Sequence, residues 1–186
     1  MTARASGEYT VEWLDSVPRI TTKRLVLRVA DESDIDELLD FAARNLEHFR
    51  GWMPESTLHP TKESLSIAVF DRLEAARLDR GYRFHLFDRA MPNKVIGLCS
   101  IADVRRGVIQ QCVLGYAIDK EYERKGLIKE AVAAAIRFAF DDLDLHRIEG
   151  SYMPNNEASA AILKSFGFEQ QGFFTEYLFL LSLIHI

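Results

Sequence analysis

The sequence predicts one mixed α+β domain, in which helices flank a central, mostly antiparallel twisted sheet. Three apolar segments follow one another at residues 82–87, 95–102 and 109–118 with only short turns between them, which is typical of an antiparallel meander. Further along, helix-like and strand-like segments alternate, and this alternation predicts βαβ units. The length of 186 residues suits a single domain with a substantial core.

The predicted order of elements is β-α-α-β-β-β-α-β-α-β. Strands are indicated by short runs of β-branched and aromatic residues, and helices by apolar residues that recur every three or four positions. Turns are indicated by glycine, proline and asparagine. The predicted strands cover residues 25–29, 82–87, 95–102, 109–118 and 147–153 and a segment that begins at 168–172, and the predicted helices cover residues 34–50, 61–78, 126–139 and 158–166.

The two ends of the chain do not fit this pattern. Residues 1–18 lack a clear period, so we expect an N-terminal arm over residues 1–20 and one domain over residues 21–180. The last nine residues, 178–186, are nearly all apolar and contain no turn signal. The end of this run, residues 181–186, resembles translated adapter sequence, so we expect a non-native tail and a sheet that lacks its last strand.

The most informative stretch is a strand, a charged turn and a helix within residues 113–136. The first N–H groups of such a helix point at the turn, and the helix dipole adds partial positive charge there. Gly126 lets the backbone approach an anion closely, and Arg124 and Lys125 add full positive charges. This arrangement favours a phosphate-binding site, although an ordinary βα unit with a solvated turn is an alternative. The dinucleotide fingerprint and the P-loop lysine motif are both missing from it.

The same stretch resembles motif A of the GNAT superfamily of N-acetyltransferases, and most closely its RimJ/RimL branch. The motif, [Gln/Arg]-x-x-Gly-x-[Gly/Ala], falls on residues 121–126, where Glu121 and Arg124 depart from the usual residues. The resemblance implies a GNAT-type acyl-CoA N-acyltransferase fold and acetyl-CoA as a substrate, with no metal. It also implies that the cofactor contacts come from Arg124, Lys125, Gly126 and Leu127 and from the strand residues Tyr116, Ala117 and Ile118.

The resemblance extends to two catalytic functions. Asn156 and Ser159 match the Asn-x-x-Ser of the branch, which implies that Asn156 binds the pantetheine amides and that Ser159 protonates the leaving thiolate. A helix N-cap is the alternative for Asn156. Tyr152 and Tyr177 are the nearest tyrosines that could serve as the acid instead. Glu176 is the expected general base, and a solvated strand residue is its alternative.

The acceptor site is predicted at the end of the first helix. Residues 44–54 combine aromatic, histidine and basic side chains around a turn. The matching region of the RimJ/RimL branch lines an acceptor-peptide groove, so Asn45, His48 and Trp52 are expected to contact the substrate. The alternative is a helix end covered by a core tryptophan.

Composition narrows the range of functions. The net charge of −5 argues against a general nucleic-acid binder and suits an enzyme with basic acceptors. Two cysteines are too few for a disulfide framework, and no segment has the length and apolar character of a signal peptide or a membrane span. We therefore expect a cytoplasmic enzyme, monomeric or homodimeric, with no membrane or direct nucleic-acid partner.

The predicted function is acetyl transfer from acetyl-CoA to the N-terminal amine of a protein, of the ribosomal-protein alanine type, by direct attack in a ternary complex. Two alternatives stay open at this point. One is acetylation of a small amine such as a polyamine or an aminoglycoside. The other is a ribosome-assembly factor that binds acetyl-CoA but turns it over slowly.

Overall fold

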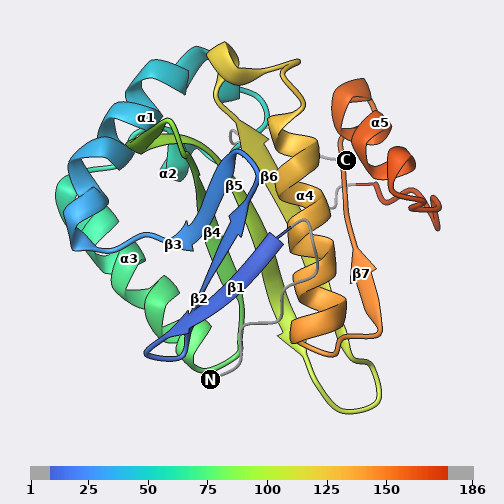
Figure 1. The fold of residues 1–186 in the computed structure, drawn as a ribbon. Helices are drawn as coiled ribbons and strands as arrows, with labels where there is room; N and C mark the ends of the chain where they lie inside the picture. The colour runs from blue at the N-terminus through green and yellow to red at the C-terminus, as the bar shows by residue number, and fades with distance from the viewer. Residues whose placement is uncertain (1–8, 176–186) are drawn as a thin grey trace.

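The computed structural model describes residues 9–175, which form a seven-stranded sheet flanked by helices (Figure 1). The strands lie in sequence order, and every neighbouring pair is antiparallel except the parallel pair β6 and β7. The strands are β1 (Tyr9–Leu14), β2 (Val17–Thr22), β3 (Leu25–Val29), β4 (Tyr82–Asp88), β5 (Met91–Arg105), β6 (Gln111–Ile118) and β7 (Arg147–Glu149). The predicted α+β class and the meander of β4, β5 and β6 are confirmed.

Helices cover both faces of the sheet, and the hydrophobic core forms two clusters, one on each face. The helices are α1 (Ile35–Phe49), α2 (Glu55–Leu58), α3 (Lys62–Arg77), α4 (Leu127–Arg137), which continues into a short π-helical turn, and α5 (Glu157–Ser165). The larger cluster packs α4 against side chains such as Leu27 and Phe84, and the smaller one packs α1 and α3 against Phe87 and Val95. The sheet therefore separates a face covered by α4 from a face covered by α1 and α3.

The helix α3 begins where its local capping signal predicts, and α1 ends where a glycine predicts its end. Thr61 caps α3 by accepting a hydrogen bond from the Ser64 N–H, and the Ser64 hydroxyl oxygen accepts one from the Thr61 N–H. Gly51 follows α1 and has a φ of 93°. Glycine adopts this left-handed conformation easily, and helices often end at such a residue. The four predicted helices are confirmed as α1, α3, α4 and α5, whereas the short helix α2 was not predicted.

The N-terminal arm predicted over residues 1–20 is wrong for its described part, because residues 9–20 belong to the hairpin of β1 and β2. Alternate residues such as Val11 and Ile20 are buried on the α4 side. The hairpin turns at Asp15 and Ser16, which both have positive φ. In a hairpin turn with two consecutive positive φ values, these positions are usually occupied by asparagine and glycine, so the sequence carried no strong turn signal here.

Two strand predictions near the C-terminus also need correction. The strand predicted over residues 147–153 ends at Glu149, and residues 168–175 form no strand. Phe168 is apolar enough to pack against the larger core cluster, but no strand lies beside its segment to complete a ladder in the described chain. A smaller correction concerns residues 91–94, which the prediction left between the strands at 82–87 and 95–102. They belong to β5, which begins directly after a tight turn at Arg89 and Ala90.

Candidate active site

The start of α4 has the geometry of an anion-binding site. Gly126 is the N-cap, with a left-handed φ of 73°, and no side chain caps the helix among the residues described. The Glu130 N–H donates to the Gly126 carbonyl oxygen at 3.2 Å, which is the first hydrogen bond of the helix. The N–H groups of the three residues before Glu130 therefore have no carbonyl acceptor within the helix. Arg124, Lys125 and Gly126 are exposed beside these groups. A phosphate at this position would meet free N–H donors, the positive end of the helix dipole and two cations.

The turn before α4 is fixed by Arg24, which sequence reasoning missed. Its Nη1 donates to the Lys125 carbonyl oxygen at 2.8 Å, and its Nε donates to Glu130 Oε2 at 2.6 Å. Glu130 Oε1 accepts two further bonds, from the Thr22 hydroxyl and the Arg24 N–H. Burial alone would raise the pKa of Glu130, but these donors lower it below its usual value, so the carboxylate stays charged. The β2–β3 turn thus holds the anion site in shape, while the charge of Arg24 is balanced by its ion pair with Glu130.

A second anchor ties the beginning of the same turn to α1. Asp119 is almost completely buried, and its Oδ2 accepts from Arg44 Nε at 2.8 Å. The Asn45 side-chain oxygen accepts from the Lys120 N–H at 3.1 Å. Burial would raise the pKa of Asp119, but hydrogen bonds from Arg44 and its neighbours lower it overall. The residues predicted to recognise the acceptor therefore include one, Asn45, that holds the turn in place.

A gap opens beside β6 at the level where the cofactor is expected. β7 pairs with β6 only from Gln111 to Val113, whereas β6 continues to Ile118. Tyr116, Ala117 and Ile118 are partly exposed along this unpaired length. Alternate residues of a strand direct their N–H and C=O groups to opposite sides, so some of these groups face the gap with no strand to pair with in residues 9–175. Such groups can bind the amides of an extended ligand, as the resemblance implies.

Two hydroxyl groups meet across the gap. The Tyr116 hydroxyl on β6 lies 3.0 Å from Ser159 Oγ on α5, and it donates to the Ser159 carbonyl oxygen at 3.1 Å. Burial raises the pKa of Tyr116, a rise that the bond to Ser159 opposes, so the phenol is protonated at neutral pH. The phenol of Tyr116 was missed, because only its backbone was considered. Tyr116 lies two positions after Leu114 and four after Cys112, so strand alternation places its side chain on the same face of β6 as these two buried residues.

Asn156 is the N-cap of α5, as one of the two sequence interpretations proposed. Its Oδ1 accepts from the Ser159 N–H at 3.0 Å, which fixes the first turn that carries Ser159. Its side-chain N–H₂ has no hydrogen-bond partner within the described chain, so this group is free to meet a ligand. Tyr152, considered as an alternative acid, donates to Gln170 Oε1 at 3.4 Å and takes no part in the hydroxyl pair.

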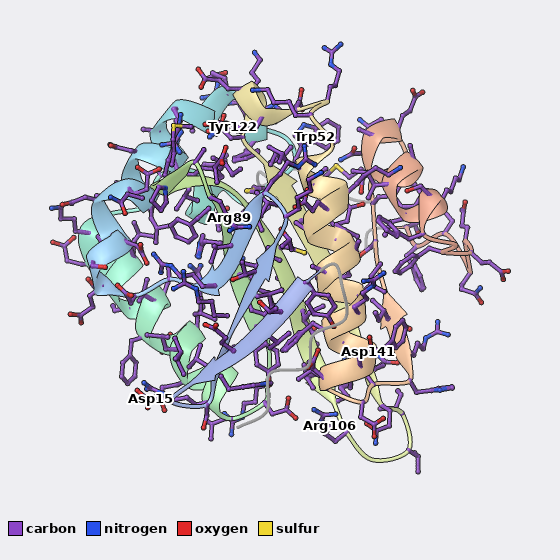
Figure 2. All side chains as sticks on the ribbon, viewed as in Figure 1. Asp15, Trp52, Arg89, Arg106, Tyr122 and Asp141 are labelled. Carbon is purple, nitrogen blue, oxygen red and sulfur yellow. The ribbon has the colours of Figure 1, made fainter. Side chains whose placement is uncertain are left out.

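The three predicted acceptor residues have different surroundings. Asn45 is 0% exposed and uses both ends of its amide, donating to the Phe41 carbonyl oxygen and accepting from Lys120, so its geometry favours a structural role. His48 lies 3.4 Å from Glu123 Oε1, measured from its Nε2. Trp52 is 41% exposed, and in Figure 2 it and Tyr122 both lie toward the end of the molecule where α4 begins. Glu176 and Tyr177 lie outside the described residues, as does the predicted tail at 181–186.

These features gather at one end of the molecule. Figure 1 shows the end of β6, the end of α1 and the starts of α4 and α5 together at the top of the view. Within the described chain, no group of histidine, cysteine and carboxylate side chains is arranged to hold a metal ion. No helix there has both the length and the apolar character that crossing a bilayer requires. Cys99 and Cys112 are buried free thiols.

Comparisons with known proteins agree with this geometry. The family model described as acetyltransferase (GNAT) domain matches residues 24–169. The ribosomal protein uS5-alanine N-acetyltransferase of Escherichia coli (strain K12) is 34% identical over 163 residues, which cover 86% of this chain and 82% of that protein.

Solved structures have the same fold. The ribosomal-protein-S5-alanine acetyltransferase of Vibrio fischeri superposes with a TM-score of 0.79 at 27% identity, covering 87% of this chain and 88% of the other. Mycobacterium smegmatis RimJ, solved in complex with CoA-disulfide, superposes with a TM-score of 0.77 at 20% identity, covering 96% of this chain and 83% of the other. With the family model matched over most of its length, the chain belongs to the GNAT family of acetyltransferases.

Proposed function

We propose that this enzyme transfers the acetyl group of acetyl-CoA to the N-terminal α-amine of a protein, with a ribosomal protein that begins with alanine as the acceptor to test first. The observation that carries the proposal is the Tyr116–Ser159 hydroxyl pair beside the unpaired length of β6. The similarity to the E. coli uS5-alanine enzyme supports the choice of acceptor. This function implies a cytoplasmic enzyme, because ribosomal proteins are made there.

Each part of the site has a separate task in the proposal. Acetyl-CoA would supply an activated acetyl thioester. The N–H groups of Gly126 and Leu127, with Arg124 and Lys125, hold its phosphates. The unpaired backbone of Tyr116, Ala117 and Ile118 and the free amide of Asn156 align its amide-bearing arm.

The hydroxyl pair supplies the proton that a sulfur leaving group needs. Either oxygen can donate, and the other can replace the proton through the 3.0 Å contact. Glu176 remains our proposed base. His48 and Trp52 remain proposed acceptor contacts, whereas we now assign Asn45 to the support of the turn.

An α-amine suits a site with a weak base. Its ordinary pKa is about 7.7–8.0, so removing its proton at pH 7 costs only about 1–1.4 kcal/mol. A lysine side chain, with a pKa of about 10.4, would cost about 4.6 kcal/mol. The chemistry therefore favours N-terminal amines over lysine side chains even without a strong base.

Mass spectrometry after incubation with acetyl-CoA tests the proposal. The acceptors are a peptide with a free N-terminal alanine, the same peptide with a blocked N-terminus and an internal lysine, and spermidine. We expect one acetyl group on the free N-terminus and none on the other two acceptors.

The other outcomes separate the alternatives. Acetylation of spermidine alone would contradict the protein acceptor and favour a small-amine enzyme. If no acceptor reacted while acetyl-CoA still bound in calorimetry, the slow binding-factor alternative would replace the proposal.

A further inference from the structure

A cavity of about 280 Å³ lies between α3 and the sheet, outside the site described so far. It is open on one side and lies where β4 begins and β5 approaches its end. Gly81 lets these segments come close, since a Cβ there would lie 3.2 Å from the Ile101 carbonyl oxygen. Its lining residues are Arg72, Ala75, Arg80, Gly81, Tyr82, Arg83, Ser100, Ile101, Ala102 and Asp103. We call this cavity the arginine pocket.

Two guanidinium groups in the arginine pocket have no partner among the described residues. Arg72 and Arg83 are partly buried, and neither forms an ion pair or side-chain hydrogen bond within residues 9–175. The Nε atom of Arg83 is buried without an acceptor. Burying a charged donor without an acceptor costs free energy, so such groups in proteins usually have a hydrogen-bond acceptor. The arginine pocket therefore lacks an acceptor that a ligand could provide.

The charges around the pocket are mostly positive. Burial, together with the charge of Arg72, lowers the pKa of Arg83 to about 10, which is still high enough to keep it charged at neutral pH. The exposed Asp103 is the carboxylate in the lining, and the nearby Asp79 is already engaged, accepting from Tyr82 and Arg106. Burial lowers the pKa of Arg72, and the charge of Asp71 offsets this only in part. An anion is the ligand that this field favours.

The arginine pocket is also aligned with the reaction centre. Arg83 on β4 pairs with Ser100 on β5, and Ser100 pairs with Gly115 on β6, so the three residues form one row across the sheet. Side chains in such a row share a face, and the Ser100 hydroxyl indeed donates to the Gly115 carbonyl oxygen. Two strand spacings separate Arg83 from Gly115, about 10 Å. Gly115 is the neighbour of Tyr116, whose side chain points to the opposite face.

This placement suits the acceptor better than the donor. The anion cradle at α4 and the hydroxyls of Tyr116 and Ser159 lie on the α4 and α5 side of the sheet. An acceptor amine needs a second approach, and the face that carries Ser100 and Arg83 provides one. An extended chain advances about 3.3 Å per residue, so about three residues span the distance from Gly115 to Arg83.

We propose that the arginine pocket binds an acidic side chain three or four residues from the N-terminus of the acceptor protein, with Arg83 and Arg72 as the ligands for its carboxylate. This inference rests on the proposed function, since it assumes that the acceptor is a peptide. Two guanidinium forks around one carboxylate give charge-assisted, directional hydrogen bonds. The pocket would then select acceptors by sequence, although the chain as a whole is acidic.

A peptide series tests this directly. Peptides share a free N-terminal alanine and a neutral background, and a single glutamate is moved from position two to position six, with glutamine at the same positions as the reference. For the wild-type enzyme we expect glutamate at position three or four to raise kcat/KM by about tenfold or more, through a lower KM. The variants Arg83→Gln and Arg72→Gln should lose this preference while still acetylating the glutamine peptides. Arg77→Gln is the matched control, because Arg77 lies on α3 but pairs with Glu74 outside the pocket.

Each other outcome has a definite meaning. Equal rates for all peptides would contradict binding of the glutamate by the arginine pocket and leave the proposed function standing. A preference for glutamate that survives in both variants would have the same meaning. No product from any peptide would overturn the proposed function and this inference together. Thermal unfolding of each variant checks the fold, and Arg72→Gln carries the test alone if Arg83→Gln unfolds.

Discussion

At the scale of single residues, the Tyr116–Ser159 contact gives the site its chemistry. The two side chains are 43 positions apart in sequence, yet their hydroxyl oxygens lie 3.0 Å apart. Burial raises the pKa of the Tyr116 phenol above its ordinary value, which already lies above neutral pH, so both groups carry a proton that can be donated. A pair of linked hydroxyls also tolerates the loss of one member better than a lone acid does, because the other can still reach the leaving group.

We therefore expect Ser159→Ala and Tyr116→Phe each to lower kcat by about 10–100-fold and the double variant to lower it further, toward 10²–10⁴-fold. The dissociation constant of CoA should change little, since the phosphate cradle lies on α4. Steady-state kinetics with an N-terminal alanine peptide, beside calorimetry with CoA, measures both quantities. Tyr152→Phe is the control, because its hydroxyl bonds Gln170 instead. Full activity in the double variant would exclude the pair from catalysis.

At the scale of elements, the junction between β6 and α4 turns a common βα unit into a phosphate cradle. Gly126 adopts the left-handed region at φ 73°, and a Cβ there would meet only Arg24 Nη2, at 3.6 Å. There is thus room for a methyl group, and it would lie at the N-terminal end of α4, where the free N–H groups are. Arg24 and Glu130 brace the same junction from the β2–β3 turn.

Replacement of Gly126 by alanine should separate the conformational requirement from the binding role. We expect a loss of about 1 kcal/mol in the free energy of unfolding from the left-handed backbone, and a dissociation constant for CoA at least about tenfold higher. Gly167→Ala is the matched control, since Gly167 has a φ of 81° and nothing within 4 Å of its Cβ position, but lies at the far end of α5. Urea unfolding and calorimetry compare the two variants. Equal CoA binding in both would show that the backbone of Gly126 does not contact the phosphates.

At the scale of the whole molecule, the sheet separates two buried environments of different polarity. The face under α4 is apolar, whereas the face under α3 holds Arg83 and the completely buried His85. Burial, followed by the charges of Arg83, Arg72 and Arg28, lowers the pKa of His85 far below its usual value. His85 is therefore neutral in the folded protein, and its Nδ1 has no hydrogen-bond partner in the structure described.

This environment predicts how stability depends on pH. Below about pH 6.5 the unfolded chain protonates His85 and the folded chain does not, so the free energy of unfolding falls as pH decreases. The limiting slope is about 1.4 kcal/mol per pH unit, and it should operate between about pH 6.5 and 5, before most carboxylates titrate. Urea unfolding at several pH values measures this slope. His85→Gln should flatten it and His146→Gln, at an exposed position, should leave it unchanged; a slope that persists in His85→Gln would assign it to other groups.

Much of the fold and part of the site could be predicted from the sequence, because these features depend on neighbours along the chain. Thr61 and Ser64 determine where α3 begins, and Arg124, Lys125 and Gly126 carry the signs of an anion site within one turn. The family resemblance rested on the same short stretch, and the comparisons confirmed it. The arm was mispredicted where a local signal was missing, at the Asp15–Ser16 turn.

What only the tertiary structure decided are the contacts between distant segments. Arg24 reaches Glu130 across 106 positions and Arg44 reaches Asp119 across 75, and neither pair shares a local pattern. The row of Arg83, Ser100 and Gly115 depends on the register of three strands. Side-chain periodicity determines which face of the sheet a residue is on, but not which residue it pairs with on the next strand. Local propensities thus determined the elements, whereas strand register and helix packing determined which side chains meet, because those contacts depend on the whole core.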